Sequence, residues 1–432
     1  MKNKSPIPIE IQNFFADEYG KTLLIKGAPG SGKTVFALTL LSTLKGNGAY
    51  LSTRVDPDTL YMQHPWIKGL ISPDNIVDAT QSEREHATKT KEITIKPLKY
   101  TGVPDFLKAV YVRTEKMEKT IVIVDSWDAV ASYTGYYEPK EKEKLEHNLC
   151  DFSRKTRTKV ILLGESIRQT SLDYLVDGVI VIESDLYEER RLRRMFMQKL
   201  RGCEIRNPVR LFSLTEGIFK SFTEFRGVEM ENPLIYDPIP DISDKRISTG
   251  IKDLDRVIKG YGNFNLFEGD HITYDILARA LSINSLNLGR YLVFTSTKQN
   301  ELISRISSYV KPEYRDNVEM IEDTKNLEER IKSDKEKFII FLNLEEREDV
   351  DEVLKEAIPP VGERCCVVMC FGGREGGTGK EMDSIASTHI KTKFISGIPC
   401  IYGEMPRTEI YAMEFEPSTP EVFPVIALTP IV

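Results

Sequence analysis

A glycine-rich segment near the amino end restricts the fold more than any other feature of the chain. Residues 22–26 form a short, mostly apolar run that leads into Gly27-Ala28-Pro29-Gly30-Ser31-Gly32-Lys33-Thr34. This is the G-x-x-x-x-G-K-T pattern of a phosphate-binding loop, and it is followed by apolar positions with helical spacing at Val35, Leu38 and Leu41. A strand, a glycine loop and a helix in this order predict an α/β fold built on a parallel sheet.

Each residue type in this loop suits one part of a bound nucleotide. The three glycines let the backbone bend so that its N–H groups face the phosphates, and the following helix adds the positive end of its dipole. We expect the lysine to reach the β- and γ-phosphates and the threonine hydroxyl to bind Mg²⁺. The alternative is a glycine-rich turn that happens to precede a helix. The predicted ATP-binding residues are Gly27, Ala28, Pro29, Gly30, Ser31, Gly32, Lys33 and Thr34.

A second apolar run supplies the acidic group that a metal-bound nucleotide needs. Residues 120–124 read Thr-Ile-Val-Ile-Val and are followed directly by Asp125. Parallel strands that are buried on both faces have continuous aliphatic sequences, so this run belongs in the middle of the sheet with Asp125 at its carboxyl edge. We expect Asp125 to hold Mg²⁺ through water, although taken alone it could equally be a strand-end turn residue.

The order of the later motifs resembles the KaiC-like branch of the RecA superfamily. The acidic strand is followed by the apolar run 159–163 with Gly164 and Glu165, by Asp177-Gly178-Val179-Ile180, by Lys199-Leu200-Arg201-Gly202, and by the closing run 211–218. The D-G-V-I and K-x-R-G stretches are similar to motifs of that family and stand in the same order. The resemblance implies a RecA-like P-loop ATPase domain over residues 1–230, with a mainly parallel central sheet.

Lys199 and Arg201 are two cations separated by one residue. Alternate side chains of a strand share a face, so the two cations are expected to project together. In KaiC-like rings the matching pair reaches the ATP held by the neighbouring subunit, so the resemblance implies a homo-oligomeric ring, usually a hexamer. The catalytic residues that it implies are Lys33, Asp125, Lys199 and Arg201. A solvated strand face and a nucleic-acid track stay open as alternatives, because eight Lys and Arg residues fall between positions 190 and 210.

One position departs from the family pattern. In RecA-like ATPases the strand after the phosphate loop ends in a glutamate that positions the attacking water, and here that place falls at or beside Arg54. A guanidinium cannot act as a base at neutral pH. Either Asp56, Asp58 or Glu165 takes over this role, or the domain hydrolyses ATP slowly and serves as a nucleotide-gated switch.

The second half of the chain reads as a repeat of the first. Residues 231–246 contain spaced prolines and are interpreted as a linker. Residues 247–255 are similar to the S-T-G-x-x-x-L-D start of KaiC-type domains, and later apolar runs repeat those of the first half. We therefore predict two tandem RecA-like domains, the second over residues 247–432.

The second copy has lost the groups that bind Mg-ATP. If Gly269 corresponds to Gly27, counting along the chain places Asp275 at the lysine position and Ile276 at the threonine position. An acid there would repel phosphate, and isoleucine has no hydroxyl for the metal. The apolar run 338–342 also ends in Asn343 where the first copy has an acid. These losses predict a degenerate domain without a phosphate loop, a pseudo-ATPase.

An intact and a degenerate domain in one chain most resemble archaeal GvpD-type P-loop proteins. The segments that also carry this likeness are Ser52-Thr53-Arg54-Val55-Asp56-Pro57 and Leu428-Thr429-Pro430-Ile431-Val432. The resemblance implies a regulator that binds Mg-ATP at a subunit interface, hydrolyses it slowly to ADP and phosphate, and acts through a protein partner. The degenerate domain would then be the docking surface.

Charge and hydropathy bear on the other function classes. The net charge of −7 argues against a protein that binds polyphosphate over its whole surface, although a RecA-like nucleic-acid-binding ATPase stays open. A KaiC-like autokinase is a further alternative, because Ser and Thr are abundant and none is singled out. No apolar run approaches the length of a membrane span, and the first residues lack an apolar segment. We expect a cytoplasmic protein that does not enter a membrane.

Overall fold

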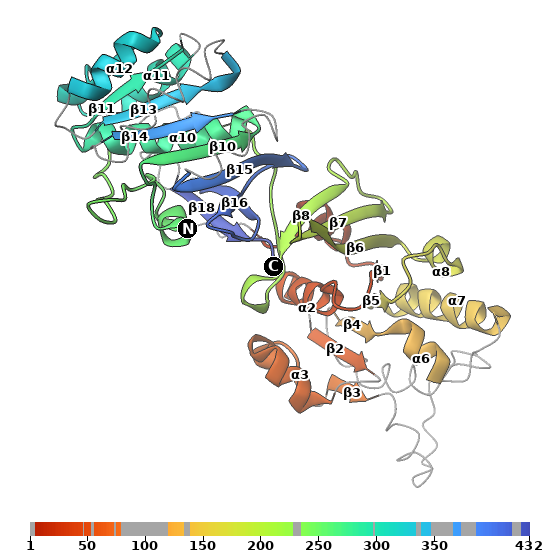
Figure 1. Ribbon diagram of the computed structural model, residues 1–432. Helices are drawn as coiled ribbons and strands as arrows, with labels where there is room; N and C mark the ends of the chain where they lie inside the picture. The colour runs from red at the N-terminus through yellow and green to blue at the C-terminus, as the bar shows by residue number, and fades with distance from the viewer. Residues whose placement is uncertain are drawn as a thin grey trace. The chain divides into compact units, whose positions relative to one another are not determined.

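The chain folds into two compact units (Figure 1). The computed structural model describes residues 5–45, 47–52, 56–72, 75–78, 120–133, 139–227, 235–296, 299–333, 338–346, 366–372, 386–416 and 425–432. The first unit comprises residues 2–222 together with Val432, and the second unit comprises residues 223–431. Within these residues, each unit is a sheet of nine strands with helices packed against it.

The sheet of the first unit has the strand order β3-β2-β4-β5-β1-β6-β7-β8-β9. The strands from β3 to β6 in this order are parallel, and β7, β8 and β9 add antiparallel pairs at one side. This confirms the prediction of a mainly parallel sheet with the run before Asp125 in its middle. The strands are β1 (Thr22–Lys26), β2 (Asn47–Ser52), β3 (Ile76–Asp78), β4 (Thr120–Asp125), β5 (Lys159–Gly164), β6 (Gly178–Tyr187), β7 (Arg190–Leu200), β8 (Val209–Ser213) and β9 (Lys220–Ser221).

Helices cover both faces of this sheet because its central strands are apolar on both sides. Leu23 and Ile25 of β1 pack in one core with α1 and α2, whereas Leu24 packs in the opposite core with α6 and α7. The helix predicted after the phosphate loop is confirmed as α2. The helices are α1 (Ile9–Phe14), α2 (Lys33–Leu44), α3 (Pro57–Gln63), α6 (Trp127–Tyr133), α7 (Pro139–Thr156) and α8 (Ser171–Leu175).

The second unit repeats the same strand order with its own strands, β12-β11-β13-β14-β10-β15-β16-β17-β18. Each strand therefore has a counterpart in the first unit, with β10 at the place of β1 and β13 at the place of β4. This confirms the prediction of tandem RecA-like α/β domains. The strands are β10 (Phe264–Gly269), β11 (Tyr291–Phe294), β12 (Val318–Met320), β13 (Phe338–Asn343), β14 (Cys366–Phe371), β15 (Thr388–Ile395), β16 (Ile398–Met405), β17 (Tyr411–Glu416) and β18 (Val425–Pro430).

The main core of the second unit lies between its sheet and three helices. Phe267, Phe294 and Phe341 of the sheet pack there with α9, α10 and α11, while Leu327 of α12 packs against the other face. Residues 223–227, which the sequence analysis assigns to the first domain, cluster with this unit. The helices are α9 (Lys252–Ile258), α10 (His271–Asn287), α11 (Asn300–Ile306) and α12 (Thr324–Ser333).

Among the described helices of the two units, none combines the length and the apolar composition that a bilayer span requires.

Candidate nucleotide-binding site

The loop between β1 and α2 has a backbone that requires glycine at two positions. Gly32 is the N-cap of α2 with a φ of 104°, and a Cβ there would lie 2.7 Å from Leu214 Cδ1. A Cβ at Gly27 would lie 2.4 Å from the backbone oxygen of Ile182 on β6. A larger residue would meet the backbone of β6 at Gly27, and it would be strained and meet Leu214 at Gly32, so the predicted glycine pattern has a structural reason.

Lys33 and Thr34 form the first turn of α2. Lys33 Nζ donates to the backbone oxygens of Gly27 at 2.7 Å and Ala28 at 3.0 Å. Thr34 Oγ1 donates to Asp125 Oδ2 at 2.7 Å, although the two residues are 91 positions apart. The fold thus brings the predicted lysine, hydroxyl and acid to one edge of the sheet.

Tyr50 joins this cluster from β2. Its hydroxyl donates to the same Asp125 Oδ2 at 2.6 Å, and its side chain is buried. Burial and the charge of Asp125 raise the pKa of Tyr50 well above its usual value, so the phenol stays a donor. Tyr50 was not among the residues that the sequence motifs singled out. Its position two residues before the end of the strand beside β4 was the only available signal.

Two of the acids considered in place of a catalytic glutamate lie in different settings, and Arg54 itself lies outside the described residues. Asp56 is the N-cap of α3, where its carboxylate accepts from the Thr59 backbone N–H at 3.0 Å and from the Thr59 hydroxyl at 2.8 Å. These hydrogen bonds lower the pKa of Asp56. Asp56 is therefore engaged in capping a helix.

Glu165 lies at the carboxyl edge of the sheet, directly after β5. This strand runs between β1 and β4, so Glu165 follows the strand that separates the phosphate loop from Asp125. Ser126 Oγ donates to Glu165 Oε1 at 3.3 Å, and the Glu165 backbone N–H donates to Asp128 Oδ2 at 3.0 Å. Its sheet position makes Glu165 a better placed candidate base than Asp56.

Arg193 of β7 forms hydrogen bonds with the backbone of the phosphate loop. Its Nη1 donates to the backbone oxygens of Ser31 at 2.9 Å and Gly30 at 3.4 Å, and its Nε donates to the Val432 oxygen at 2.6 Å. Burial and the neighbouring Arg191 lower the pKa of Arg193 to about 10, so it stays charged at neutral pH. The sequence analysis grouped Arg193 with the surrounding basic residues and gave no signal that it holds the loop.

Lys199 and Arg201 lie at the opposite edge of the sheet from Lys33. Lys199 Nζ donates to the Tyr174 backbone oxygen at 3.3 Å, and Arg201 Nη2 donates to the same oxygen at 2.9 Å. The two side chains share a side as predicted, although Arg201 stands in the turn after β7. The Arg201 backbone N–H donates to the Asp177 backbone oxygen, and the Asp177 carboxylate accepts from the N–H of Thr22, the first residue of β1. Within one subunit the structure does not bring this pair to the phosphate loop.

The second unit replaces the phosphate loop with helix. Only Asp270 stands between β10 and α10, and residues 271–274 form an additional helical turn where the first unit has its loop. Asp275, at the counted lysine position, pairs with Arg279 at 2.5 Å. The interpretation that this unit lacks a phosphate loop is therefore confirmed at the level of the backbone.

The strand pairing also identifies the counterparts of the acidic cluster. Following paired positions across each sheet from Gly27 and from Gly269, Asp125 corresponds to Asn343 and Tyr50 corresponds to Phe294. The repeated Tyr-Leu pair of the two sequences, Tyr50-Leu51 and Tyr291-Leu292, would suggest Tyr291 as the counterpart of Tyr50, and the strand register shows that it is not. The second unit thus lacks the phenol and the carboxylate, and it has Ile276 at the counted position of Thr34.

Comparisons with known proteins agree with this architecture. Residues 11–200 match the family described as the P-loop domain of the GvpD gas vesicle protein. Protein GvpD2 of Halobacterium salinarum is 30% identical over 261 residues, which is 59% of this chain and 52% of that protein. Protein GvpD1 of the same organism is 28% identical over 261 residues, 59% of this chain and 48% of that protein. The chain thus spans about half the length of these curated relatives, and its residues 11–200 are similar to the P-loop domain of GvpD proteins.

Proposed function

We propose that the first unit binds Mg-ATP and that nucleotide state is passed on to a regulatory protein partner. The observation that carries this proposal is the hydrogen bond from Thr34 to Asp125 beside the glycine loop. It joins the hydroxyl and the carboxylate that P-loop proteins use for the metal, at the carboxyl edge where open α/β sheets bind ligands.

The residues present fit a nucleotide with its metal. The backbone N–H groups of the loop and the charge of Lys33 would hold the phosphates, while Thr34 and Asp125 would hold Mg²⁺. The buried Ser31 hydroxyl has no hydrogen-bond partner among the described residues, so it would be available to donate to a bound phosphate. Lys33 would exchange the two loop carbonyls for phosphate oxygens. Bound Mg²⁺ would supply neutralisation of phosphate charge.

Slow hydrolysis belongs to the same proposal. Glu165 is the described acid that follows the strand between the phosphate loop and Asp125, and Ser126 holds its carboxylate. We expect Glu165 to orient water at this edge, a weaker arrangement than a base at the end of β2. In the Glu165→Gln variant ATP binding should persist while phosphate release falls.

The first experiment measures phosphate release from ATP with Mg²⁺ for the wild type and for Lys33→Ala. We expect release from the wild type to exceed that of the variant by about tenfold or more, because the variant loses a charged contact to phosphate. Lys68→Ala is the matched control, since Lys68 is an exposed lysine of the same unit. If the wild type binds ATP but releases no phosphate, the protein is a nucleotide sensor and the ATPase activity is rejected.

A ring of subunits would give Lys199 and Arg201 a function. Both lie at the edge of the sheet that is remote from Lys33, so only a neighbouring copy could bring them to the nucleotide. We expect Lys33→Ala and Arg201→Ala to be inactive alone and to regain part of the activity when mixed, because mixed interfaces would pair an intact loop with an intact Arg201. Failure of the mixture to regain activity, with the oligomer intact, would contradict an active site shared between subunits.

The regulatory part of the proposal follows from the relatives. The matched family carries a gas vesicle description, so a gas vesicle system is where the protein partner should be sought. The second unit, without a phosphate loop, would serve for interaction.

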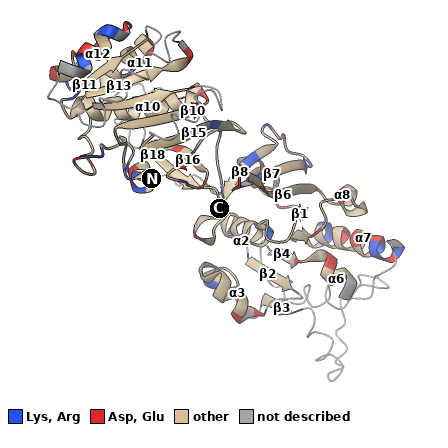
Figure 2. Ribbon diagram, viewed as in Figure 1, with Lys and Arg blue, Asp and Glu red and all other residues tan. Residues whose placement is uncertain are grey.

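A nucleic-acid track on the basic stretch of β7 and its neighbours is less well supported. Figure 2 colours the Lys and Arg of this region blue, and many of these cations already pair with carboxylates or backbone oxygens. Arg194 pairs with Asp185 at 2.7 Å, and Arg210 pairs with Glu10 at 2.9 Å. Binding phosphates there would require breaking these pairs. For an autokinase, no serine or threonine stands out as the residue that would accept the phosphate.

A further inference from the structure

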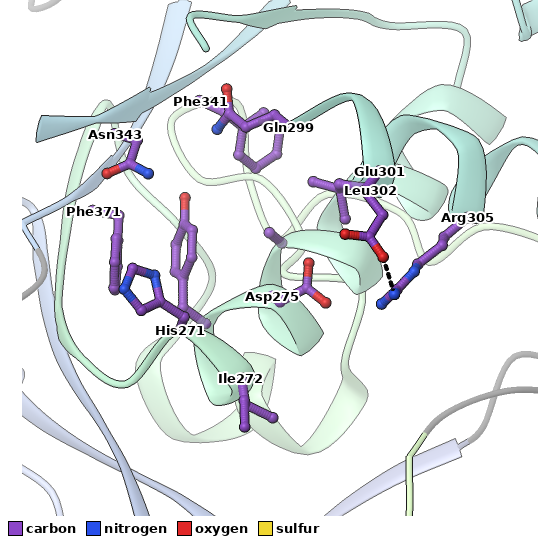
Figure 3. Close-up of a pocket in the computed structure, with 12 residues that line it drawn as sticks. His271, Ile272, Asp275, Gln299, Glu301, Leu302, Arg305, Phe341, Asn343 and Phe371 are labelled. Carbon is purple, nitrogen blue, oxygen red and sulfur yellow. Dashed lines mark hydrogen bonds and ion pairs between the residues drawn. The ribbon is translucent and has the colours of Figure 1, made fainter. Parts of the chain in front are cut away.

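The second unit has a pocket where the first unit has its nucleotide site. The pocket has a volume of about 310 Å³ and lies at the carboxyl edge of β13 and β14, beside the beginnings of α10 and α11. Figure 3 shows His271, Phe371 and Asn343 on one side, Asp275 at the start of α10, and Glu301 with Arg305 from α11. The residue types therefore combine flat rings with polar groups, which is typical of a small-molecule site.

The rings of this pocket form an aromatic surface that is mostly buried, with the exposed His271 ring at its edge. Tyr274 and Phe371 are stacked with their centroids 4.4 Å apart and their planes at 21°. The His271 ring lies 4.8 Å from Phe371, and Phe341 lines the same pocket. A planar heterocycle would stack on the exposed His271 ring, and such stacking tolerates any base.

The polar groups around these rings are mainly donors. The Gln299 oxygen accepts from the backbone N–H groups of Thr295 at 3.1 Å and Ser296 at 3.2 Å, so its amide presents N–H groups. The Asn343 oxygen accepts from the Glu345 N–H at 3.2 Å, with the same result. The buried Tyr274 hydroxyl has no partner within the described ranges, and burial raises its pKa, so it stays protonated.

A second pocket, of about 370 Å³, adjoins the first and has a different charge. Arg226, Arg279 and Arg305 line it together with a single carboxylate, that of Asp275. Asp275 pairs with Arg279 at 2.5 Å, and the buried Arg279 Nε has no hydrogen-bond partner among the residues described. Arg305 is also paired with Glu301, so the three guanidinium groups face two carboxylates, and one positive charge and the Arg279 Nε donor are left for an anion such as a phosphate monoester.

The two pockets meet at Ile272, Asp275 and Arg305, which line both. A ligand that joins a planar ring to an anion over a short spacer would place its ring on the aromatic surface and its anion among the arginines. We propose that the second unit binds a nucleoside monophosphate at these joined pockets, independently of the nucleotide bound by the first unit.

The arrangement selects a monophosphate over a triphosphate. A chain of three phosphates needs a loop of backbone N–H groups, and α10 begins directly after Asp270. Additional phosphates would also meet the carboxylates of Asp275 and Glu301. A free nucleoside would leave the arginines unused, and inorganic phosphate would leave the rings unused.

Titration calorimetry on the full chain with Lys33→Ala, which weakens the site of the first unit, tests the proposal. The probes are AMP, GMP, the two nucleosides, inorganic phosphate and ATP. We expect one monophosphate to bind at least about tenfold tighter than its nucleoside, inorganic phosphate or ATP, because each competitor loses or repels a charged contact.

Variants of the second unit then locate the binding. Arg305→Gln should weaken it about tenfold and Tyr274→Phe about fivefold, through a lost charged contact and a lost hydrogen bond. The matched controls are Arg256→Gln, an exposed arginine of α9 paired with Asp253, and Tyr261→Phe, another buried tyrosine without a hydroxyl partner among the described residues. Both should bind as the parent does.

Three results would overturn the proposal. The first is no binding of either monophosphate at millimolar concentration. The second is binding that Arg305→Gln leaves unchanged, which would place it elsewhere. The third is inorganic phosphate or ATP binding as tightly as the monophosphates, which would remove the role of the rings or the selection against longer phosphates.

Discussion

The first unit has six residues between β1 and α2, whereas the second has one between β10 and α10. The strand order around them is the same. The glycine at the corresponding position, Gly27 in the first unit and Gly269 in the second, packs against the backbone of the neighbouring strand in its sheet. The difference is a single turn of chain that is loop in one unit and helix in the other. A RecA-like sheet thus tolerates loss of the phosphate loop without any change in topology.

A buried charge shows the same tolerance. Lys26 of β1 corresponds to Glu268 of β10 through the register of the strands. Lys26 pairs with Asp173 of α8 at 2.8 Å, whereas Glu268 lies 3.2 Å from His389 of β15. Each unit therefore pairs the side chain at this position with a partner from a different element. The fold fixes where a charge is buried, and the local sequence decides its sign.

The largest effect is expected at the glycine that both units share. A Cβ at Gly269 would lie 1.8 Å from the Thr392 backbone oxygen, and its φ is 123°. Gly269→Ala should lower the free energy of unfolding of the second unit by about 4 kcal/mol, because backbone must move. Both tryptophans, Trp66 and Trp127, lie in the first unit, so circular dichroism should show early loss of the second unit while tryptophan fluorescence keeps its midpoint.

Gly289→Ala is the control for this experiment. Gly289 has a φ of 79°, but a Cβ there would meet atoms no closer than 3.5 Å. Only the cost of the left-handed backbone remains, about 1 kcal/mol. Equal effects of the two substitutions would show that the contact with β15 is not the reason for the glycine.

The next effect distinguishes the two buried pairs. Asp173→Asn leaves the Lys26 ammonium buried without a carboxylate and should cost the first unit about 3 kcal/mol. Glu268→Gln should cost the second unit less, about 1 kcal/mol, because imidazole can remain neutral. Urea unfolding followed by tryptophan fluorescence and by circular dichroism measures the two. A larger loss for Glu268→Gln would reverse the comparison.

The pH dependence of the first unit should reflect the same pair. Burial alone would raise the pKa of Asp173, but hydrogen bonds from Lys26 and Thr170 outweigh it and lower the pKa. A lowered carboxyl pKa adds stability above the unfolded value near 3.9, and this is lost as pH falls through the folded value. The urea concentration at the midpoint of unfolding, followed by fluorescence, should therefore decrease as the pH is lowered below about 4. In Asp173→Asn this decrease should be smaller. An equal fall in the variant would assign it to other carboxylates.

Much of the fold could be predicted because buried parallel strands have a recognisable sequence. The aliphatic runs at 120–124, 159–163 and 338–342 became β4, β5 and β13, each in the middle of its sheet. The glycine pattern identified the loop because few other residues permit its turn and its approach to β6. Local chemistry was therefore sufficient for these elements.

The remaining features depend on pairing between distant segments. Tyr50 reaches Asp125 only because β2 and β4 are neighbours with a given register, and the sequence alone does not contain that register. In the sequence Arg193 is one basic residue among several, and only the position of β7 in the sheet brings its side chain to the backbone of the phosphate loop. The additional turn of α10 was also invisible, because counting residues does not distinguish loop from helix.

The smallest effect tests whether Tyr50 is part of the metal site. Tyr50→Phe gives the first unit the residue that the second unit has at this position, Phe294, and the ring should pack as before. Asp125 Oδ2 would keep Thr34 as its donor but lose the phenol, so we expect Mg-ATP affinity to fall about fivefold, close to 1 kcal/mol. Tyr61→Phe removes a different buried hydroxyl of the same unit, which donates to the Ile71 oxygen at 2.7 Å, and should leave affinity unchanged. If the two variants bind Mg-ATP equally well across a range of Mg²⁺ concentrations, Tyr50 contributes packing alone, and the two units differ at the metal position only by the acid and the threonine.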